Sequence, residues 1–152
     1  MAYEFKIEER PAQAAVTIRT RTSMEGLPAF FEQAFGKVYS HISQAGQHPS
    51  GPAFALYHTQ DPSNFDLEAG FPVVAPVAGN GEVQASEIPG GKVCTTLLIG
   101  PYERLPEAWE ALTAHAASEG LESQSWGYEI YISDPTTVPP EEIQTEVVLP
   151  LK

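Results

Sequence analysis

The chain has 152 residues, about the length of one domain, and 42% of them are apolar, which excludes a disordered protein and suffices for a buried core. Twenty acidic residues against eight basic ones give a net charge of −12, which disfavours direct contact with nucleic acid or an anionic membrane. No apolar run is long enough for a transmembrane helix, the N-terminal segment lacks a signal-peptide pattern, and the single cysteine, Cys94, excludes an internal disulfide. We therefore expect a cytoplasmic protein.

The first half of the chain predicts strands around one amphipathic helix. Apolar residues recur at three- and four-residue steps over 27–42, which predicts a helix with one buried face. Pro28 suits its first turn, and Gly46 suits the left-handed position beyond its end. The strands of this half are expected over 14–20, 53–58 and 67–74.

The second half predicts the same succession of elements. A second amphipathic helix is expected over 105–116, opened by Pro106 and closed by Gly120. The segment before it carries Asn80-Gly81, a strong signal for a tight hairpin turn. The strands of this half are expected over 92–99, 128–133 and 145–150.

Several residues recur in the same order in both halves, which indicates an internal duplication. The matched pairs are Pro11 and Pro89, Thr17 and Thr95, Leu27 and Leu105, Pro28 and Pro106, Gly46 and Gly120, Tyr57 and Tyr131, and Glu68 and Glu146. We predict one domain over 1–152, with an internal repeat of about 1–78 and 79–152. The expected fold class is α+β: duplicated units with pseudo-two-fold symmetry, an antiparallel sheet with two helices packed on it, and a ligand cleft between the halves.

One acid breaks the symmetry of the two halves. On the strand 128–132, Glu129 and Tyr131 point to the same face, and Glu129 aligns with Ala55 of the first half. Glu129 is either a solvated side chain on an open sheet face or a pocket acid. Trp109 fits core packing best, and the tyrosines at 57, 102 and 131 fit the core and a pocket equally. The phenylalanines at 30, 31 and 35 are expected in the core.

Taken together, these segments resemble the GyrI-like effector-binding family, whose members occur alone or as the ligand-binding part of AraC-type and MerR-type multidrug regulators. The resemblance is carried by ERPAQAAVTIRTRT, LPAFFEQAFGKVYSHI, GFPVVAPV, GPYERLPEAWEAL, YEIYISDP and TEVVLPL. It implies two fused β-α-β-β units with a pocket lined by aromatic rings and a glutamate. No segment corresponds to the DNA-binding domain of the regulators, so the resemblance implies a stand-alone member that does not itself bind DNA.

The resemblance also implies the residues of the pocket. The acid-x-tyrosine motif of the family falls on Glu129 and Tyr131, and its glycine-proline-tyrosine motif falls on Gly100, Pro101 and Tyr102. Further ligand contacts are expected from Tyr57, Phe71, Trp109 and Trp126, together with Ala55.

The sequence offers little for cofactor chemistry. The histidines at 41, 48, 58 and 115 show no metal-ligand spacing, so we expect no metal and no cofactor. Cys94, in the middle of a strand, is expected to be a buried, inert thiol. No serine lies in a nucleophile-elbow motif.

Three functions remain open. The first is binding of a lipophilic, cationic small molecule, a drug or an effector, with Glu129 as counter-charge. The second is hydrolysis of cyclopropane-bearing or similar electrophilic natural products, as in some stand-alone relatives, with Glu129 activating water and Tyr102 supporting it. The third is an acidic interaction protein, such as a gyrase inhibitor, whose protein partner would be gyrase or a regulator.

Overall fold

The computed structural model describes residues 3–59, 61, 63–134 and 136–152. The chain divides into two compact units. One consists of residues 11–90, and the other of 91–152 together with the N-terminal segment that ends at Arg10. They are called the 11–90 unit and the 91–152 unit below. No helix among the described residues has the length and apolar character needed to cross a membrane.

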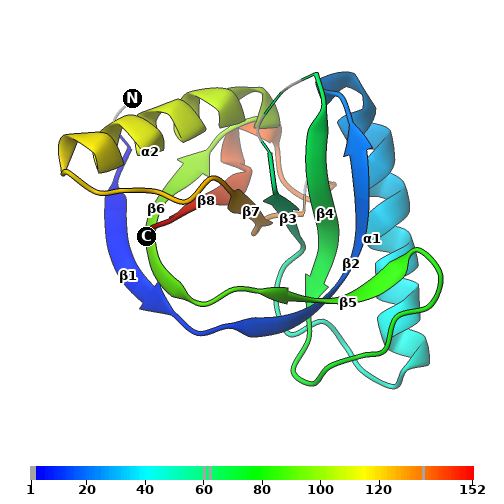
Figure 1. Ribbon diagram of the computed structural model, residues 1–152. Coiled ribbons are helices and arrows are strands. Elements are labelled where there is room, and N and C mark those ends of the chain that lie inside the picture. Colours follow the sequence, from blue (N-terminus) through cyan, green and yellow to red (C-terminus); the bar gives the residue numbers. More distant parts are fainter. Residues whose placement is uncertain (1–2, 60, 62, 135) are drawn as a thin grey trace. The chain divides into compact units, whose positions relative to one another are not determined.

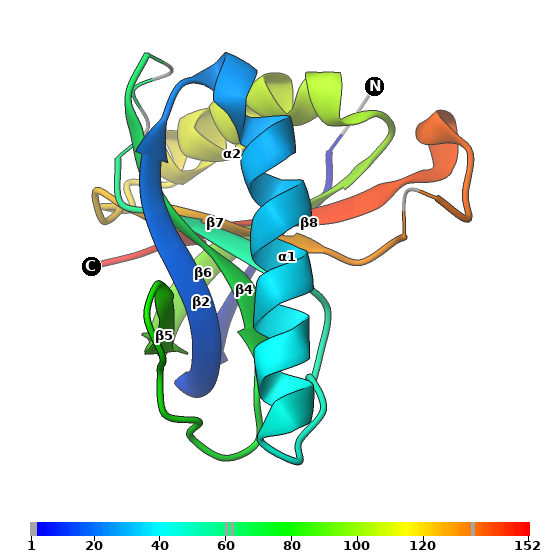
Figure 2. The ribbon, with the colours of Figure 1, turned by 90° about the vertical axis from the view of Figure 1, so that its right-hand side faces the viewer.

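The 11–90 unit contains antiparallel strands in the order β3-β4-β2-β5, with one helix packed on them. The strands are β2 (Gln13–Thr22), β3 (Phe54–Tyr57), β4 (Phe65–Pro72) and β5 (Val83–Ile88). A short 3-10 turn, η1 (Met24–Gly26), leads into helix α1 (Leu27–Gln44), which lies across β2 and β4 (Figure 2). The helix and the three strands predicted for this half are confirmed, with β4 over Phe65–Pro72 rather than 67–74.

Helix α1 forms where the apolar periodicity places it. Its fully buried side chains are Leu27, Ala34, Val38 and Ile42. Beyond its end Gly46 has φ of 80°, a conformation that favours glycine, and Gln47 N–H donates back to the Ile42 carbonyl at 3.1 Å. Both the helix and its glycine stop were predicted from the sequence.

The 91–152 unit repeats this plan with strands in the order β1-β6-β8-β7. Its elements are β1 (Phe5–Arg10), β6 (Gly91–Ile99), η2 (Tyr102–Arg104), α2 (Leu105–Ser118), β7 (Gly127–Tyr131), η3 (Pro140–Glu142) and β8 (Gln144–Pro150). Helix α2 packs against β6 and β8 (Figure 1). Its Leu112 and Ala116 join a buried cluster that includes Cys94, whose thiol pKa is raised by burial, as expected for an inert cysteine.

These findings confirm the α+β class, the antiparallel pairing and the helix packed on each set of strands. The ladders also agree in register: Leu56 lies opposite Glu68 in one unit, and Ile130 lies opposite Glu146 in the other. The shared register supports an internal duplication, which stays a prediction, as does the cleft between the halves.

The two units do not coincide with the two halves of the sequence. Strand β1 belongs by sequence to the first half but pairs with β6 of the 91–152 unit, and β5 pairs with β2 of the 11–90 unit. In the segment from β4 to the start of β5, Asn80 and Val83 exchange backbone hydrogen bonds around Gly81, which has φ of 63°. The predicted tight turn therefore forms, but it closes an isolated bridge rather than a hairpin of two strands.

Candidate functional site

The polar centre of the 91–152 unit is the carboxylate of Glu129 on β7. Glu129 is 4% exposed, so it is not the solvated side chain that the sequence left open. Its Oε2 accepts a hydrogen bond from Trp109 Nε1 at 2.6 Å, and its Oε1 accepts one from the Tyr131 hydroxyl at 2.7 Å. Trp109 and Tyr131 thus each donate one hydrogen bond to the carboxylate. Hydrogen bonds to an ionised acceptor are stronger than those between neutral groups, so both bonds stabilise the charged form, whereas burial opposes it.

The strand and the helix each supply one donor for a simple geometric reason. Glu129 and Tyr131 are two residues apart on β7, so their side chains share one face of the strand. Trp109 reaches that face from α2. The apolar stripe of the helix predicted Trp109 in the core, and its ring does pack against the buried cluster. Its indole N–H, however, also donates a hydrogen bond to Glu129.

Gly127 makes room for the indole. A Cβ atom built at this position would lie 2.6 Å from Cη2 of Trp109 and 3.1 Å from the backbone oxygen of Val148. Real Cβ atoms do not approach that closely, so a side chain here would displace the ring. The glycine at the start of β7 therefore sets the position of the donor that faces Glu129.

Tyr102 belongs to the same group. It lies in η2, and its ring meets that of Tyr131 edge-on, with centroids 5.9 Å apart and an interplanar angle of 83°. Burial raises the pKa of the Tyr102 hydroxyl, and the nearby charges of Asp134 and Glu129 raise it further. The hydroxyl therefore stays protonated at neutral pH and can donate a hydrogen bond.

Trp126 is not brought together with this group. Its indole stacks on Tyr128, with centroids 6.2 Å apart and an angle of 16°. Because Tyr128 neighbours Glu129 on the strand, its side chain points to the opposite face. The described contacts of Trp126 therefore place it on the side of β7 away from the carboxylate.

The other predicted pocket residues lie in the 11–90 unit. Ala55 is fully buried, and Tyr57 is 6% exposed with its ring edge-on to Phe65 at 5.4 Å. Phe71 meets Phe35 and Tyr39 of α1 edge-on, at 5.8 and 6.0 Å. The phenylalanines of α1 at 30, 31 and 35, expected in the core, are only partly buried, so that prediction holds in part. A continuous, half-exposed aromatic row thus runs along α1 and β4, and it consists of Phe30, Phe31, Phe35, Tyr39 and Phe71.

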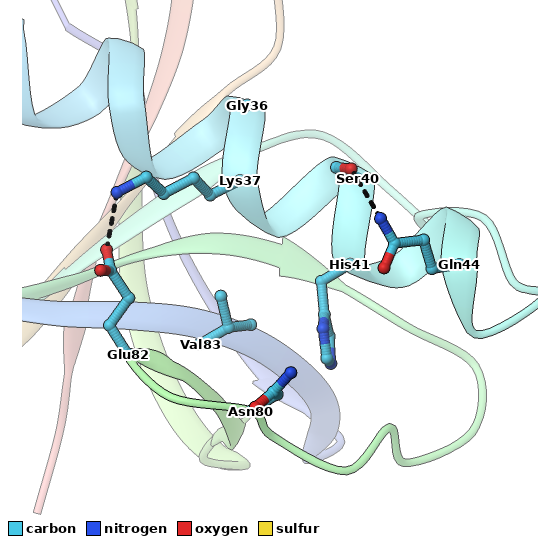
Figure 3. A pocket seen from close by; sticks show the side chains of 8 residues that line it. All are labelled: Gly36, Lys37, Ser40, His41, Gln44, Asn80, Glu82 and Val83. Atoms are coloured by element: carbon cyan, nitrogen blue, oxygen red, sulfur yellow. Dashed lines mark hydrogen bonds and ion pairs between the residues drawn. The ribbon is translucent and has the colours of Figure 1, made fainter.

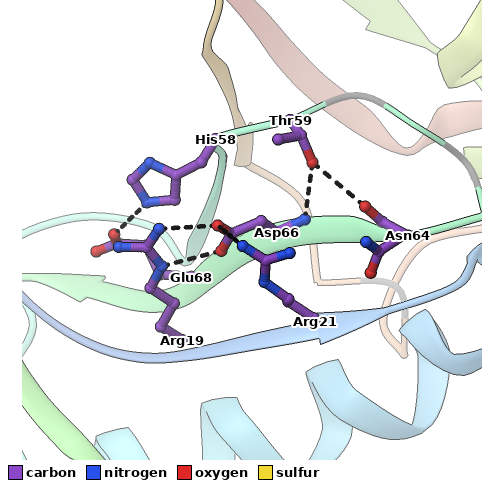
Figure 4. Close-up of polar contacts among 7 residues, drawn as sticks. All are labelled: Arg19, Arg21, His58, Thr59, Asn64, Asp66 and Glu68. Atoms are coloured by element: carbon purple, nitrogen blue, oxygen red, sulfur yellow. Dashed lines mark hydrogen bonds and ion pairs between the residues drawn. The ribbon is translucent and has the colours of Figure 1, made fainter.

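Sequence reasoning missed a polar cluster centred on β2 and β4, which His58, just after β3, and Ser86 of β5 also join (Figure 4). The guanidinium of Arg19 donates to both oxygens of Asp66, at 2.9 and 2.8 Å, and His58 Nε2 lies 2.8 Å from Glu68 Oε2. The hydroxyls of Thr17 and Ser86 donate to the other Glu68 oxygen. Glu68 is therefore held from several sides, as a buried structural acid is. The sequence signal that could have revealed this cluster is the pair of acids Asp66 and Glu68, two residues apart on β4.

A shallow pocket lies beside α1 (Figure 3). Its lining residues are Gly36, Lys37, Ser40, His41, Gln44, Asn80, Glu82 and Val83. Lys37 and Glu82 pair across it at 3.1 Å, and His41 Nε2 lies 2.7 Å from the Ala78 carbonyl. Its charged groups already pair with one another, so it offers less for recognition than the Glu129 group. Within the described residues, no group of three or more His, Cys, Asp or Glu side chains is arranged to hold a metal ion.

The comparison with protein families agrees with this arrangement. Residues 3–152 match the model of the GyrI-like small-molecule-binding domain. The chain therefore belongs to the GyrI-like family, which confirms the resemblance found in the sequence, and the binding of a small molecule is the function that membership supports. No curated protein matches the sequence.

Solved structures share the fold. The C-terminal domain of EcmrR superposes with a TM-score of 0.89 at 21% identity, covering 100% of this chain and 99% of that one. SAV2435 bound to tetraphenylphosphonium gives 0.69 at 12% identity, covering 98% and 94%. A hydrolase from Listeria innocua gives 0.67 at 14% identity, covering 98% and 92%. At these identities the likeness shows the fold alone.

Proposed function

We propose that the chain binds lipophilic cations and that Glu129 supplies the counter-charge. The observation that carries this proposal is a buried carboxylate beside the aromatic rings of Trp109 and Tyr131. Both rings donate a hydrogen bond to Glu129, which stabilises the ionised acid. A ligand cation beside Glu129 gains Coulomb energy that is larger in a buried site than in water.

The rings around the acid suit the same class of ligand. Trp109, Tyr131 and Tyr102 are aromatic groups within one cluster, and each ring face attracts a cation by roughly 0.5–2 kcal/mol, depending on desolvation. Phe71 of the 11–90 unit stays a predicted ligand contact and lies in the half-exposed aromatic row along α1. Tyr57 and Ala55 stay predicted contacts as well. A structural neighbour that holds tetraphenylphosphonium is consistent with this choice.

A second candidate is hydrolysis at the same acid. Tyr102, whose hydroxyl stays protonated, lies beside Tyr131 and within electrostatic reach of Glu129. Glu129 would orient or deprotonate a water molecule, and Tyr102 would donate to the developing oxyanion. A hydrolase among the structural neighbours makes this candidate worth a direct assay of electrophilic substrates.

The test compares a cation with a neutral molecule of similar size. Binding of tetraphenylphosphonium and of triphenylphosphine oxide is measured by calorimetry for the wild type and for Glu129→Gln. We expect the substitution to weaken the cation by at least about tenfold, since one charge is removed from a buried site, and to change the neutral probe far less. Glu119→Gln, at an exposed position of equal chemistry, is the matched control. Equal losses for both probes would refute the electrostatic account.

A further inference from the structure

Thr145 carries a polar atom that the folded chain leaves unsatisfied. Its side chain is fully buried, and among the described residues its Oγ1 is the buried side-chain polar atom that has no hydrogen-bond partner. A buried hydroxyl without a partner destabilises a protein, because it has lost its bonds to water and gained none in return. Such an atom calls for an explanation.

Its place on β8 puts Thr145 in the Glu129 group. Thr145 lies directly opposite Tyr131 in the β7–β8 ladder. Directly opposed residues of an antiparallel pair project to the same face, with their Cβ atoms about 5 Å apart. Tyr131 turns toward Glu129 on the face that α2 covers, so the Thr145 hydroxyl lies on that face as well.

The equivalent position in the 11–90 unit shows that packing does not require a hydroxyl. There Tyr57 lies opposite Leu67, just as Tyr131 lies opposite Thr145. Leu67 is fully buried, so an apolar side chain fills the same place without an unsatisfied atom. The fold is therefore built once with leucine and once with threonine.

Other residues around Glu129 also differ from their counterparts in the 11–90 unit by carrying a hydrogen-bonding group. The ladders and the starts of η1, η2, α1 and α2 match the residues of the two units in pairs. The pairs are Ala55 and Glu129, Met24 and Tyr102, Phe31 and Trp109, and Leu67 and Thr145. In each pair, the residue of the 91–152 unit adds a group that can hydrogen-bond. Thr145 thus belongs to a set of polar residues gathered around one acid, in one unit only.

We propose that Thr145 is a ligand-binding residue of the Glu129 site. Its hydroxyl pairs with a hydrogen-bonding atom that enters with the ligand, either an oxygen or nitrogen of the ligand itself or a water molecule held beneath it. The neighbouring Tyr131 is only partly buried. The proposal requires its side chain to move to another rotamer, so that the partner atom reaches the hydroxyl. The inference rests on the proposed function, because it assigns a second polar contact to the same site.

The test removes the hydroxyl while keeping the shape of the side chain. Calorimetry measures the dissociation constants of wild type, Thr145→Val and Thr145→Ser. The probes are tetraphenylphosphonium, which has no hydrogen-bonding atom, and the three isomers of (hydroxyphenyl)triphenylphosphonium, which add one hydroxyl at different depths. Thr145→Ser, which retains the hydroxyl, is expected to bind like the wild type.

Two results support the proposal and identify the partner atom. If the ligand supplies it, Thr145→Val weakens at least one hydroxylated isomer by about 3- to 10-fold, the worth of one hydrogen bond, and leaves tetraphenylphosphonium unchanged. If a water molecule supplies it, Thr145→Val weakens all four cations by a similar factor.

One result overturns it. If Thr145→Val binds every cation as the wild type does, whatever its melting temperature, the hydroxyl is merely an unsatisfied atom of the fold. The Glu129→Gln variant separates this failure from that of the proposed function. Unchanged binding in that variant refutes the role of the acid, whereas unchanged binding in Thr145→Val alone refutes only the role of the hydroxyl.

Discussion

Removing the Tyr131 hydroxyl tests whether the donors of Glu129 also stabilise the fold. Tyr131→Phe keeps the ring and its edge contact with Tyr102 but deletes the bond of 2.7 Å to a buried carboxylate. A hydrogen bond to a charged group contributes about 1.5–3 kcal/mol, more than one between neutral groups. For a domain of this size, each kcal/mol corresponds to roughly 2–4 °C in melting temperature. We therefore expect the variant to melt about 3–12 °C lower than the wild type.

The assay is thermal and urea unfolding at neutral pH, with a matched control and a double-mutant cycle. Tyr39→Phe removes a hydroxyl from a ring that is 49% exposed, and we expect it to change stability by less than about 0.5 kcal/mol. In a Glu129→Gln background the acceptor is neutral, so Tyr131→Phe should there cost only about 0.5–1.5 kcal/mol. Equal effects of Tyr131→Phe and Tyr39→Phe, or no coupling in the cycle, would contradict a charged acceptor at Glu129.

Two further predictions follow from other contacts. Gly127→Ala places a Cβ atom 2.6 Å from the indole of Trp109, so we expect the free energy of unfolding to fall by about 1–3 kcal/mol. Because the ring is displaced, we also expect a shift in tryptophan fluorescence and weaker tetraphenylphosphonium binding. Wild-type fluorescence and binding in this variant would show that the glycine does not position the ring. The hydrogen bond from Arg19 holds the pKa of the Asp66 carboxyl below its usual range. The ionised carboxylate therefore stabilises the fold at pH values above the pKa of an aspartate in the unfolded chain, about 3.9, and this stabilisation is lost as the pH falls toward the pKa in the folded protein. The slope of stability against pH below about 4 should therefore be smaller in Asp66→Asn than in the wild type, and identical acid-unfolding curves would contradict it.

The helices and most strands could be predicted because their signals are local. The apolar stripe over 27–42, with Pro28 and Gly46 at its ends, determines α1 from neighbouring residues alone, and the same holds for α2. The partnership of Glu129 with Tyr131 was equally local, since residues two apart on a strand share a face.

The remaining contacts depend on pairings between distant segments. Trp109 is 20 residues from Glu129, and Thr17 is 51 residues from Glu68, so neither bond has a signature within a sequence window. The unsatisfied Thr145 hydroxyl is invisible for the same reason, because it depends on what β7 and α2 place around it. Burial of the α1 phenylalanines was overestimated since helical periodicity gives the direction of a side chain but not the edge of the core.

The pairing of β1 with β6 has a consequence for how the protein forms during synthesis. Strand β1 leaves the ribosome before its partner positions, Gly91 to Thr96, which are made some 85 residues later. Until then its backbone groups stay unpaired, and the 91–152 unit cannot finish its set of strands. Pairings between segments so distant in the chain are slow to form, so the closing of β1 onto β6 is a late event in folding. Strand β1 therefore completes the 91–152 unit only after β6 has been made.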